Sequence, residues 1–256
     1  MKLQFIGVGS AFTKRYYQSN MLLSHDDEKL LLDCGTTAHQ ALADLGLDIK
    51  DLIGCYISHP HADHIGGLEE YALCSYFNPV KHDIWPGGKP KMFIDEASSY
   101  ELWDNSLKGG LRTLEGQVPT LDTYFDIVRV PKNSTFEAIG HTFHTVQVYH
   151  VMDKYHPMPA FGLIWETDNN RVFCTTDAQH CPNQMIRLYK DATIIFQDCE
   201  TTPWKSGVHA HYDELKELDA DIKAKMWLYH YWDGDLPDAE ADGFAGFIKQ
   251  GQVFEL

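Results

Sequence analysis

The sequence is short of positive charge. Its 256 residues hold 21 lysines and arginines against 37 aspartates and glutamates, which gives a formal net charge of −16. A protein that holds a long nucleic acid relies on lysine and arginine contacts to phosphates, and this surface would on average repel one. Small anions are less affected, because divalent ions in a pocket can supply the positive charge that the surface lacks. The composition therefore disfavours a long nucleic acid as partner.

Other features are absent as well. No apolar run reaches membrane-spanning length, residues 1–7 enter a strand pattern in place of a signal peptide, and no Pro/Gly/Ser-rich linker divides the chain. The six cysteines include no Cys-x-x-Cys pair, and several fall in apolar runs, as free buried thiols do. We expect one domain over residues 1–256 in a soluble, cytoplasmic protein that does not bind membranes, with no metal on its cysteines.

The densest chemistry lies in residues 58–68, Ser-His-Pro-His-Ala-Asp-His-Ile-Gly-Gly-Leu, which follow an apolar run that predicts a buried strand. In an extended loop, residues two apart project the same way. His59 and His61 can therefore bind one ion, while Asp63 and His64, past the bend, face a second. Imidazole nitrogen and carboxylate oxygen suit zinc, with manganese or iron as alternatives. The segment predicts a metal site on the loop that leaves this strand.

This His-x-His-x-Asp-His pattern resembles the signature of the metallo-β-lactamase superfamily, and the resemblance extends over nearly the whole chain. It implies an α/β fold, the αββα sandwich of two mixed β-sheets flanked by helices, with the metals at one edge. Asp33 matches the first motif of the superfamily, where the aspartate orients a ligand histidine without binding metal itself. A helix cap for the segment from Thr36 onward is the alternative role for Asp33.

The run 135–151 alternates between apolar and polar residues and predicts two strands. His150 closes it, and a short loop then leads to Phe161-Gly162. This order looks like the third motif of the branch that contains tRNA 3′-processing ribonucleases and related phosphodiesterases. His150 is then the third ligand of the first ion, with His141 and His144 as rivals.

Two later residues complete the set that the resemblance implies. Asp177, at a strand end, matches the bridging aspartate of the superfamily, and His230 lies near the end of an aromatic strand in residues 226–232. The implied cofactors are two divalent metal ions, Zn²⁺ first and Mn²⁺ as the alternative, which activate water for hydrolysis. One ion is bound by His59, His61, His150 and Asp177, and the other by Asp63, His64, His230 and Asp177.

The same branch carries a further histidine that acts on the phosphate. His211, before a predicted helix at 213–225, fits this role best, with His209 as the alternative. Asp198 or Glu200 matches the acidic residue that partners this histidine in the branch. The predicted catalytic residues are therefore His211, Asp63, Asp198 and Glu200, with Asp63 also a metal ligand.

Substrate is suggested by a closer resemblance. The tRNA-processing members usually carry a long basic, Gly-rich arm, and the sequence contains none. Residues 5–12, the metal loop and residues 228–232 resemble small phosphodiesterases that degrade 3′,5′-cyclic nucleotides, in particular the phage anti-Pycsar proteins, which silence a bacterial immune signal. The resemblance implies hydrolysis to nucleoside 5′-monophosphates, in the host cytoplasm if the chain is phage-encoded. The alternatives are a tRNA endonuclease, a glyoxalase-type thioester hydrolase and a protein that sequesters nucleotides without catalysis.

A single cyclic nucleotide needs aromatic stacking and a few polar contacts. Members of the branch generally form homodimers, so we expect a homodimer. In it, a loop of one subunit, such as residues 85–90 or 155–159, would close over the metals of the other subunit. The candidate substrate-binding residues are the aromatic side chains nearest the predicted metal edge and the alternative histidine: Phe12, Tyr155, Phe161, Tyr231, Trp232 and His209.

Overall fold

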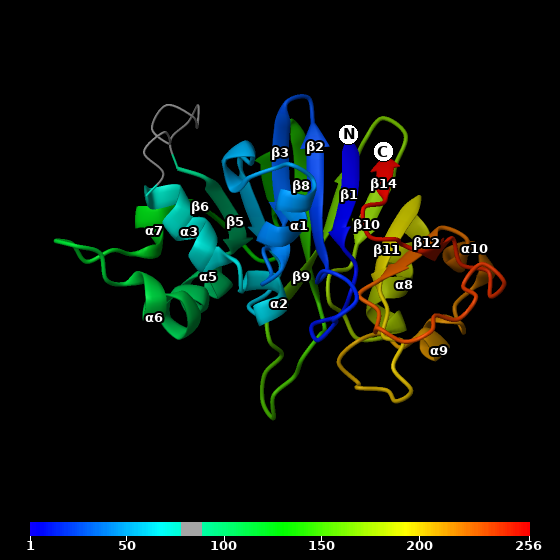
Figure 1. The fold of residues 1–256 in the computed structure, drawn as a ribbon. Coiled ribbons are helices and arrows are strands. Elements are labelled where there is room, and N and C mark those ends of the chain that lie inside the picture. Colours follow the sequence, from blue (N-terminus) through cyan, green and yellow to red (C-terminus); the bar gives the residue numbers. More distant parts are fainter. Residues whose placement is uncertain (78–88) are drawn as a thin grey trace.

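The computed structural model describes residues 1–77 and 89–256, and it consists of two seven-stranded sheets packed face to face with helices outside (Figure 1). This layering confirms the predicted αββα sandwich. Among the described residues, no helix is both long and apolar enough to cross a membrane.

The first sheet has the strand order β14-β1-β2-β3-β4-β5-β6. Strands β1, β2 and β3 form an antiparallel meander, after which β3, β4, β5 and β6 run parallel. Strand β4 is buried along its whole length, as its apolar sequence predicts, and the metal loop begins where it ends. The strands are β1 (Lys2–Gly7), β2 (Asn20–His25), β3 (Glu28–Leu32), β4 (Gly54–Ile57), β5 (Lys91–Asp95), β6 (Asp126–Val130) and β14 (Val253–Glu255).

The second sheet has the order β13-β12-β11-β10-β9-β8-β7. The two strands expected in residues 135–151 are present as β7 and β8. Histidine or aspartate side chains follow β8, β10 and β12, and Asp198 ends β11. The carboxyl ends of these strands meet the loop after β4 at one edge of the sandwich. The strands are β7 (Thr135–Ala138), β8 (His141–Val148), β9 (Ala160–Glu166), β10 (Arg171–Cys174), β11 (Ile194–Asp198), β12 (Met226–Tyr229) and β13 (Gly246–Phe247).

Short helices cover the outer faces. The prediction of one helix at 213–225 is wrong, because Asp219 has non-helical dihedral angles (φ −54°, ψ 142°) and separates α9 from α10. Leu215 and Ile222 are both buried in the core. The α-helices are α1 (Ala38–Asp44), α2 (Ala62–Ile65), α3 (Leu68–Phe77), α5 (Glu96–Leu102), α6 (Lys108–Leu111), α7 (Leu121–Tyr124), α8 (Pro182–Asp191), α9 (Tyr212–Leu215) and α10 (Ala220–Lys223), with a 3₁₀ turn at Ile49–Asp51 and a π-helical turn at Trp103–Leu107.

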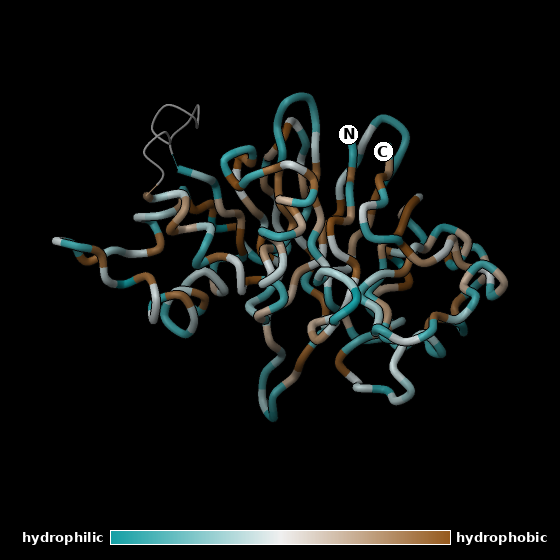
Figure 2. The backbone as a smooth tube through the Cα atoms, in the orientation of Figure 1, coloured by the Kyte–Doolittle hydropathy of each residue, from teal (hydrophilic) through white to brown (hydrophobic). Residues whose placement is uncertain are grey.

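Three apolar layers hold the sandwich together. The central one, between the sheets, includes Phe5, Trp165 and Phe196, and the outer two lie under the helices of each sheet. Figure 2 shows the hydrophobic stretches along the strands and hydrophilic ones in many of the connecting loops. Because packed interiors resist deformation, the strand ends form a rigid frame for the side chains that follow them.

Candidate metal centre

The metal loop changes conformation in its middle. His61 is extended (φ −75°, ψ 151°), and the single helical turn α2 then begins at Ala62. This bend separates His59 and His61 from Asp63 and His64, as the sequence predicts. The loop packs tightly on the segment that contains Gly35, because a Cβ added to Gly35 would lie 1.9 Å from the Asp63 carbonyl oxygen. Glycine is therefore needed at position 35 for the two segments to touch.

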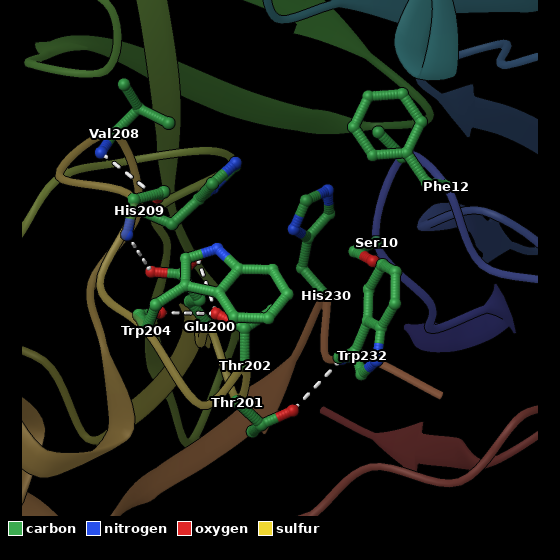
Figure 3. Close-up of a pocket in the computed structure, with 12 residues that line it drawn as sticks. Ser10, Phe12, Glu200, Thr201, Thr202, Trp204, Val208, His209, His230 and Trp232 are labelled. Carbon is green, nitrogen blue, oxygen red and sulfur yellow. Dashed lines mark hydrogen bonds between the residues drawn. The ribbon is translucent and has the colours of Figure 1, made fainter. Parts of the chain in front are cut away.

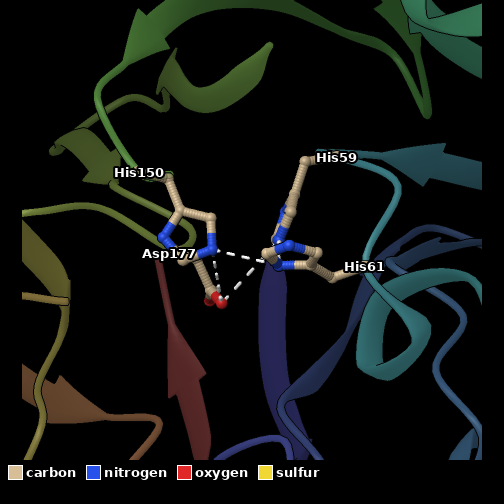
Figure 4. A group of neighbouring side chains, drawn as sticks. All are labelled: His59, His61, His150 and Asp177. Atoms are coloured by element: carbon tan, nitrogen blue, oxygen red, sulfur yellow. Dashed lines mark hydrogen bonds and ion pairs between the residues drawn. The ribbon is translucent and has the colours of Figure 1, made fainter. Parts of the chain in front are cut away.

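The structure brings the first predicted ligand group together. The Nδ1 atom of His61 lies 3.1 Å from Nε2 of His59 and 3.1 Å from Nε2 of His150. Asp177 completes the group (Figure 4). The four ligand atoms, one from each residue of the group, lie within 4.8 Å of one another. Of the rivals to His150, His144 is exposed and His141 stacks edge-on against His25, so neither joins the group.

The second predicted group is assembled as well. The Oδ2 atom of Asp63 lies 3.2 Å from Nε2 of His64 and 3.3 Å from Nε2 of His230. Asp177 also belongs to this group, whose ligand atoms again lie within 4.8 Å of one another. All four side chains are buried. One carboxylate is thus shared by two adjoining groups of nitrogen and oxygen donors.

Asp177 is the centre of the arrangement. Its Oδ2 atom faces nitrogens of five imidazoles, at 3.1 Å from His64, 3.4 Å from His230, 3.8 Å from His59, 3.8 Å from His150 and 4.0 Å from His209. Its other oxygen, Oδ1, is buried and has no hydrogen-bond partner among the described residues. A buried carboxylate oxygen without a donor is costly unless a cation satisfies it. The donors present therefore fit divalent metal ions of the zinc or manganese type.

Asp33 binds the His64 ring on the side that faces away from the cluster. Its Oδ2 atom lies 2.7 Å from Nδ1 of His64 and accepts a 2.7 Å hydrogen bond from the Ser58 hydroxyl, while Oδ1 accepts from the Ser58 backbone N–H at 2.8 Å. The bond to Nδ1 directs Nε2 of His64 toward the cluster. Helix α1 has its N-cap at Thr37, so Asp33 does not cap it. This is the geometry of a carboxylate that orients a metal-binding histidine.

Charge and burial shape the protonation of the cluster. Burial lowers the pKa of His59 and His61, and it lowers the pKa of His150 to about 4. Burial acts to raise the pKa of Asp177, but the neighbouring His230 and His64 outweigh it and hold that pKa well below the usual range. A metal ligand must be a neutral imidazole or an ionised carboxylate, and these shifts favour those forms at His59, His61, His150 and Asp177. At His64 and His230 burial acts to lower the pKa, but the neighbouring Asp177 outweighs it and raises the pKa, so these two rings must lose a proton to bind a metal ion.

His209 lies beside the cluster. Its Nδ1 donates to Asp198 Oδ2 at 2.7 Å, and its ring lies 4.8 Å from the rings of both His150 and His230. Asp198 is fully buried and also accepts the Ala178 backbone N–H at 2.9 Å. The Asp198 bond leaves Nε2 of His209 for a bound ligand. Asp177, Asp198, His209 and His230 also form a third group with metal-binding geometry.

His211 has a different environment. It caps helix α9, where its Nδ1 accepts the Asp213 backbone N–H at 3.2 Å and its Nε2 donates to the Thr202 carbonyl at 2.9 Å. Both ring nitrogens are therefore used within the fold. Glu200 accepts hydrogen bonds from the Thr202 hydroxyl and the Ser206 backbone N–H. His211 and Glu200 thus both hold the segment 201–209 and do not reach the cluster.

A cavity of about 260 Å³ opens beside His209 and His230 (Figure 3). Of the predicted substrate-binding aromatics, Phe12 and Trp232 line it. Phe161 is buried within β9. The two remaining candidates lie outside the lining: Tyr155 is exposed, and Tyr231 packs in the core with its hydroxyl bonded to the Ile248 carbonyl.

Trp204 is an aromatic lining residue that was not predicted from the sequence, although the candidate site residues Glu200 and His209 lie on either side of it in the chain. It is 60% exposed and also borders the cavity. Only the fold of the segment 201–209 brings its ring beside the cluster.

The chain is similar to known proteins over nearly its whole length. Residues 1–254 match the family model described as "Anti-Pycsar protein Apyc1". The chain is 32% identical to an anti-Pycsar protein Apyc1 of Paenibacillus xerothermodurans over 259 residues, which cover 100% of this chain and 98% of that protein. It is 33% identical to one of Bacillus phage 010DV004 over 270 residues, with 100% and 98% coverage.

Among solved structures, the chain is similar to the metallo-beta-lactamase fold protein YhfI from Bacillus subtilis. The TM-score is 0.74 at 18% identity, and the match covers 99% of this chain and 98% of that one. This likeness shows the metallo-β-lactamase fold.

Proposed function

The chain belongs to the anti-Pycsar protein Apyc1 family, and from this membership we propose that it is a metal-dependent phosphodiesterase that hydrolyses 3′,5′-cyclic nucleotides to nucleoside 5′-monophosphates. The observation that carries the proposal is the pair of donor groups that share Asp177 next to a cavity for a small ligand. Relatives of this name in Bacillus phages support a role in evading cyclic-nucleotide immunity, in the cytoplasm of the host.

The seven predicted ligands would hold two divalent ions, most simply Zn²⁺, with Asp177 common to both. Bound there, such ions would supply the positive charge that activates water and neutralises a phosphodiester. The protein contributes the fixed positions of the donors, since Asp33 orients His64 and the Val208 carbonyl accepts from Nδ1 of His150 at 2.7 Å. Both contacts direct Nε2 of the ligand ring toward the cluster.

We assign the proton-donating role to His209 with Asp198, in place of His211 with Glu200. The Asp198 carboxylate holds Nδ1 of His209 and stabilises the ring when it is protonated, so that Nε2 can donate a proton to the leaving O3′. His209 lines the cavity, whereas both nitrogens of His211 are bonded within the fold. Proximity to the cluster therefore favours the dyad of His209 and Asp198.

We further propose a homodimer. The hairpin after β8 carries the exposed side chains of Met152 and Tyr155, and a second subunit would cover this apolar surface. The other predicted closing loop, residues 85–90, lies mostly outside the described residues. Light scattering coupled to size-exclusion chromatography tests the assembly: twice the mass of 29.2 kDa is expected, and a monomer at micromolar concentration would contradict it.

The function is tested by giving the metal-loaded protein 3′,5′-cyclic nucleotides, a precursor tRNA and a thioester in parallel. We expect turnover of the cyclic nucleotides at a rate that changes little with salt, because few phosphate contacts are made. Asp177→Asn is the matched inactive variant, since it removes the shared carboxylate charge and keeps the side-chain size. Efficient tRNA trimming with a steep salt dependence would favour the endonuclease, and thioester turnover would favour the glyoxalase-type enzyme. Binding of cyclic nucleotides without turnover would favour sequestration.

A further inference from the structure

The cavity next to the metal centre has a mainly apolar lining. It is bordered by residues of the segments 10–12 and 200–208 together with His209, His230 and Trp232. Its volume of about 260 Å³ lies just below the range of roughly 300–1,000 Å³ that suits a whole drug-sized ligand. This space is the size for part of a mononucleotide whose phosphate lies at the metal centre.

Three aromatic side chains border this cavity. Trp204 is 60% exposed and Phe12 is 74% exposed, while Trp232 is half-buried. In Figure 3 the Trp204 ring lies to the left of His230, and Trp232 and Phe12 lie to its right. Large exposed apolar side chains that gather around one cavity commonly mark a binding site.

Hydrogen bonds hold the Trp204 segment in place. Glu200 Oε2 accepts the Ser206 backbone N–H at 2.8 Å, and Glu200 Oε1 accepts the Thr202 hydroxyl at 3.0 Å. His211 adds its bond to the Thr202 carbonyl. The segment is therefore ordered without ligand, which lowers the entropic cost of binding.

The Phe12 segment has its own support. The Asp233 carboxylate accepts hydrogen bonds from the Thr13 hydroxyl at 2.5 Å and from the backbone N–H groups of Lys14 and Arg15 at 2.6 and 3.2 Å. The Ser10 N–H donates to the Tyr231 carbonyl at 3.0 Å. These bonds attach the segment that bears Phe12 to the chain that bears Trp232.

The polar groups of the cavity are mostly occupied by the protein. Both Glu200 oxygens accept hydrogen bonds from the protein, the Thr202 hydroxyl donates within its own segment, and the Thr201 hydroxyl accepts the backbone N–H of Trp232 at 3.0 Å. Apart from the buried Ser10 hydroxyl, which has no partner among the described residues, few of these groups remain to contact the edge of a ligand. An occupant would therefore be held mainly through its faces, which requires a flat aromatic molecule.

We infer that Trp204, Trp232 and Phe12 form the binding site for the nucleobase, which they hold by stacking while the phosphate lies at the metal centre. This inference rests on the proposed function for the identity of the ligand. It assigns the three side chains to substrate affinity and not to the chemical step. Stacking is sequence-tolerant, so loss of one ring weakens binding of purines and pyrimidines alike.

The first arm of the test is kinetic. Trp204→Ala and Phe12→Ala are each expected to raise KM for a cyclic nucleotide about 5–100-fold with kcat changed less than about threefold. Trp204→Phe keeps a ring and should retain most of the affinity. Tyr100→Ala is the matched control, because Tyr100 is also an exposed aromatic residue, at 56%, but lies on α5 away from the cavity. An unchanged KM in both alanine variants would overturn the inference.

The second arm does not depend on catalysis. Binding of adenosine, uridine and ribose 5-phosphate is measured by calorimetry on the wild type and the same variants. The two nucleosides should lose affinity in Trp204→Ala and Phe12→Ala, and ribose 5-phosphate, which has no base, should not. Equal weakening of all three ligands, or of none, would refute a base-stacking site. If the wild type fails to turn over cyclic nucleotides, the proposed function falls, and this arm still decides whether the rings bind a base.

Discussion

Replacement of His209 by alanine is the sharpest test of the assignment of roles at the site. General acid catalysis contributes roughly 10²–10⁴-fold, or about 2.7–5.4 kcal/mol of transition-state stabilisation, so kcat should fall by that factor. Folding should survive, because Asp198 keeps its bond from the Ala178 N–H and its 3.4 Å contact to His230. The loss of one partner of a buried carboxylate still costs about 1–3 kcal/mol, which a thermal melt would record.

His211→Ala is the matched control, since it removes the same side chain two residues away. It loses two hydrogen bonds, worth about 1 kcal/mol each, and should lower stability while kcat stays within a few-fold of the wild type. Rates are measured with saturating cyclic nucleotide, and bound metal is counted in every variant. An active His209→Ala beside an inactive His211→Ala would return the role to His211. Loss of metal from His209→Ala would instead identify His209 as a ligand.

Three further outcomes are expected. Asp33→Ala should weaken metal binding about 10–100-fold without removing a ligand, as a metal titration would show, and an unchanged affinity would refute the orienting role. Gly35→Ala should also weaken metal binding, because its Cβ would collide with the Asp63 carbonyl, whereas Gly109→Ala, with no atom within 4 Å of its Cβ, should not; equal effects would contradict the packing argument. Metal at 100 times its Kd should stabilise the fold by about 2.7 kcal/mol, so a chelator should lower Tm, and an unchanged Tm would contradict metal binding to the folded state.

Spacing within a short segment made the metal loop predictable. The alternation of His59, His61, Asp63 and His64 after an apolar strand specifies which side chains diverge, and the structure has the expected bend at Ala62. The sandwich was implied by the resemblance to a known superfamily, whereas apolar and alternating runs predicted only individual strands. Strands β13 and β14, of two and three residues, are too short to give a periodic signal, so the sequence does not predict them.

The choice between His209 and His211 shows what the sequence could not decide. Both precede the same helical segment, and each has an acidic residue available within 13 positions along the chain. Only tertiary contacts distinguish them, because the fold places Asp198 at the end of β11 beside His209 and turns His211 into a helix cap. Trp204 was missed for the same reason, since its proximity to the centre depends on the path of the segment 201–209.

The most direct test of a two-metal phosphodiesterase is to titrate divalent metal into metal-depleted protein while phosphorus NMR follows a 3′,5′-cyclic nucleotide. Asp177 joins two donor groups, so hydrolysis should rise until about two ions are bound per chain and should yield only the nucleoside 5′-monophosphate. Full activity with one ion per chain, release of the 3′-monophosphate, or an intact cyclic nucleotide at saturating metal would contradict it.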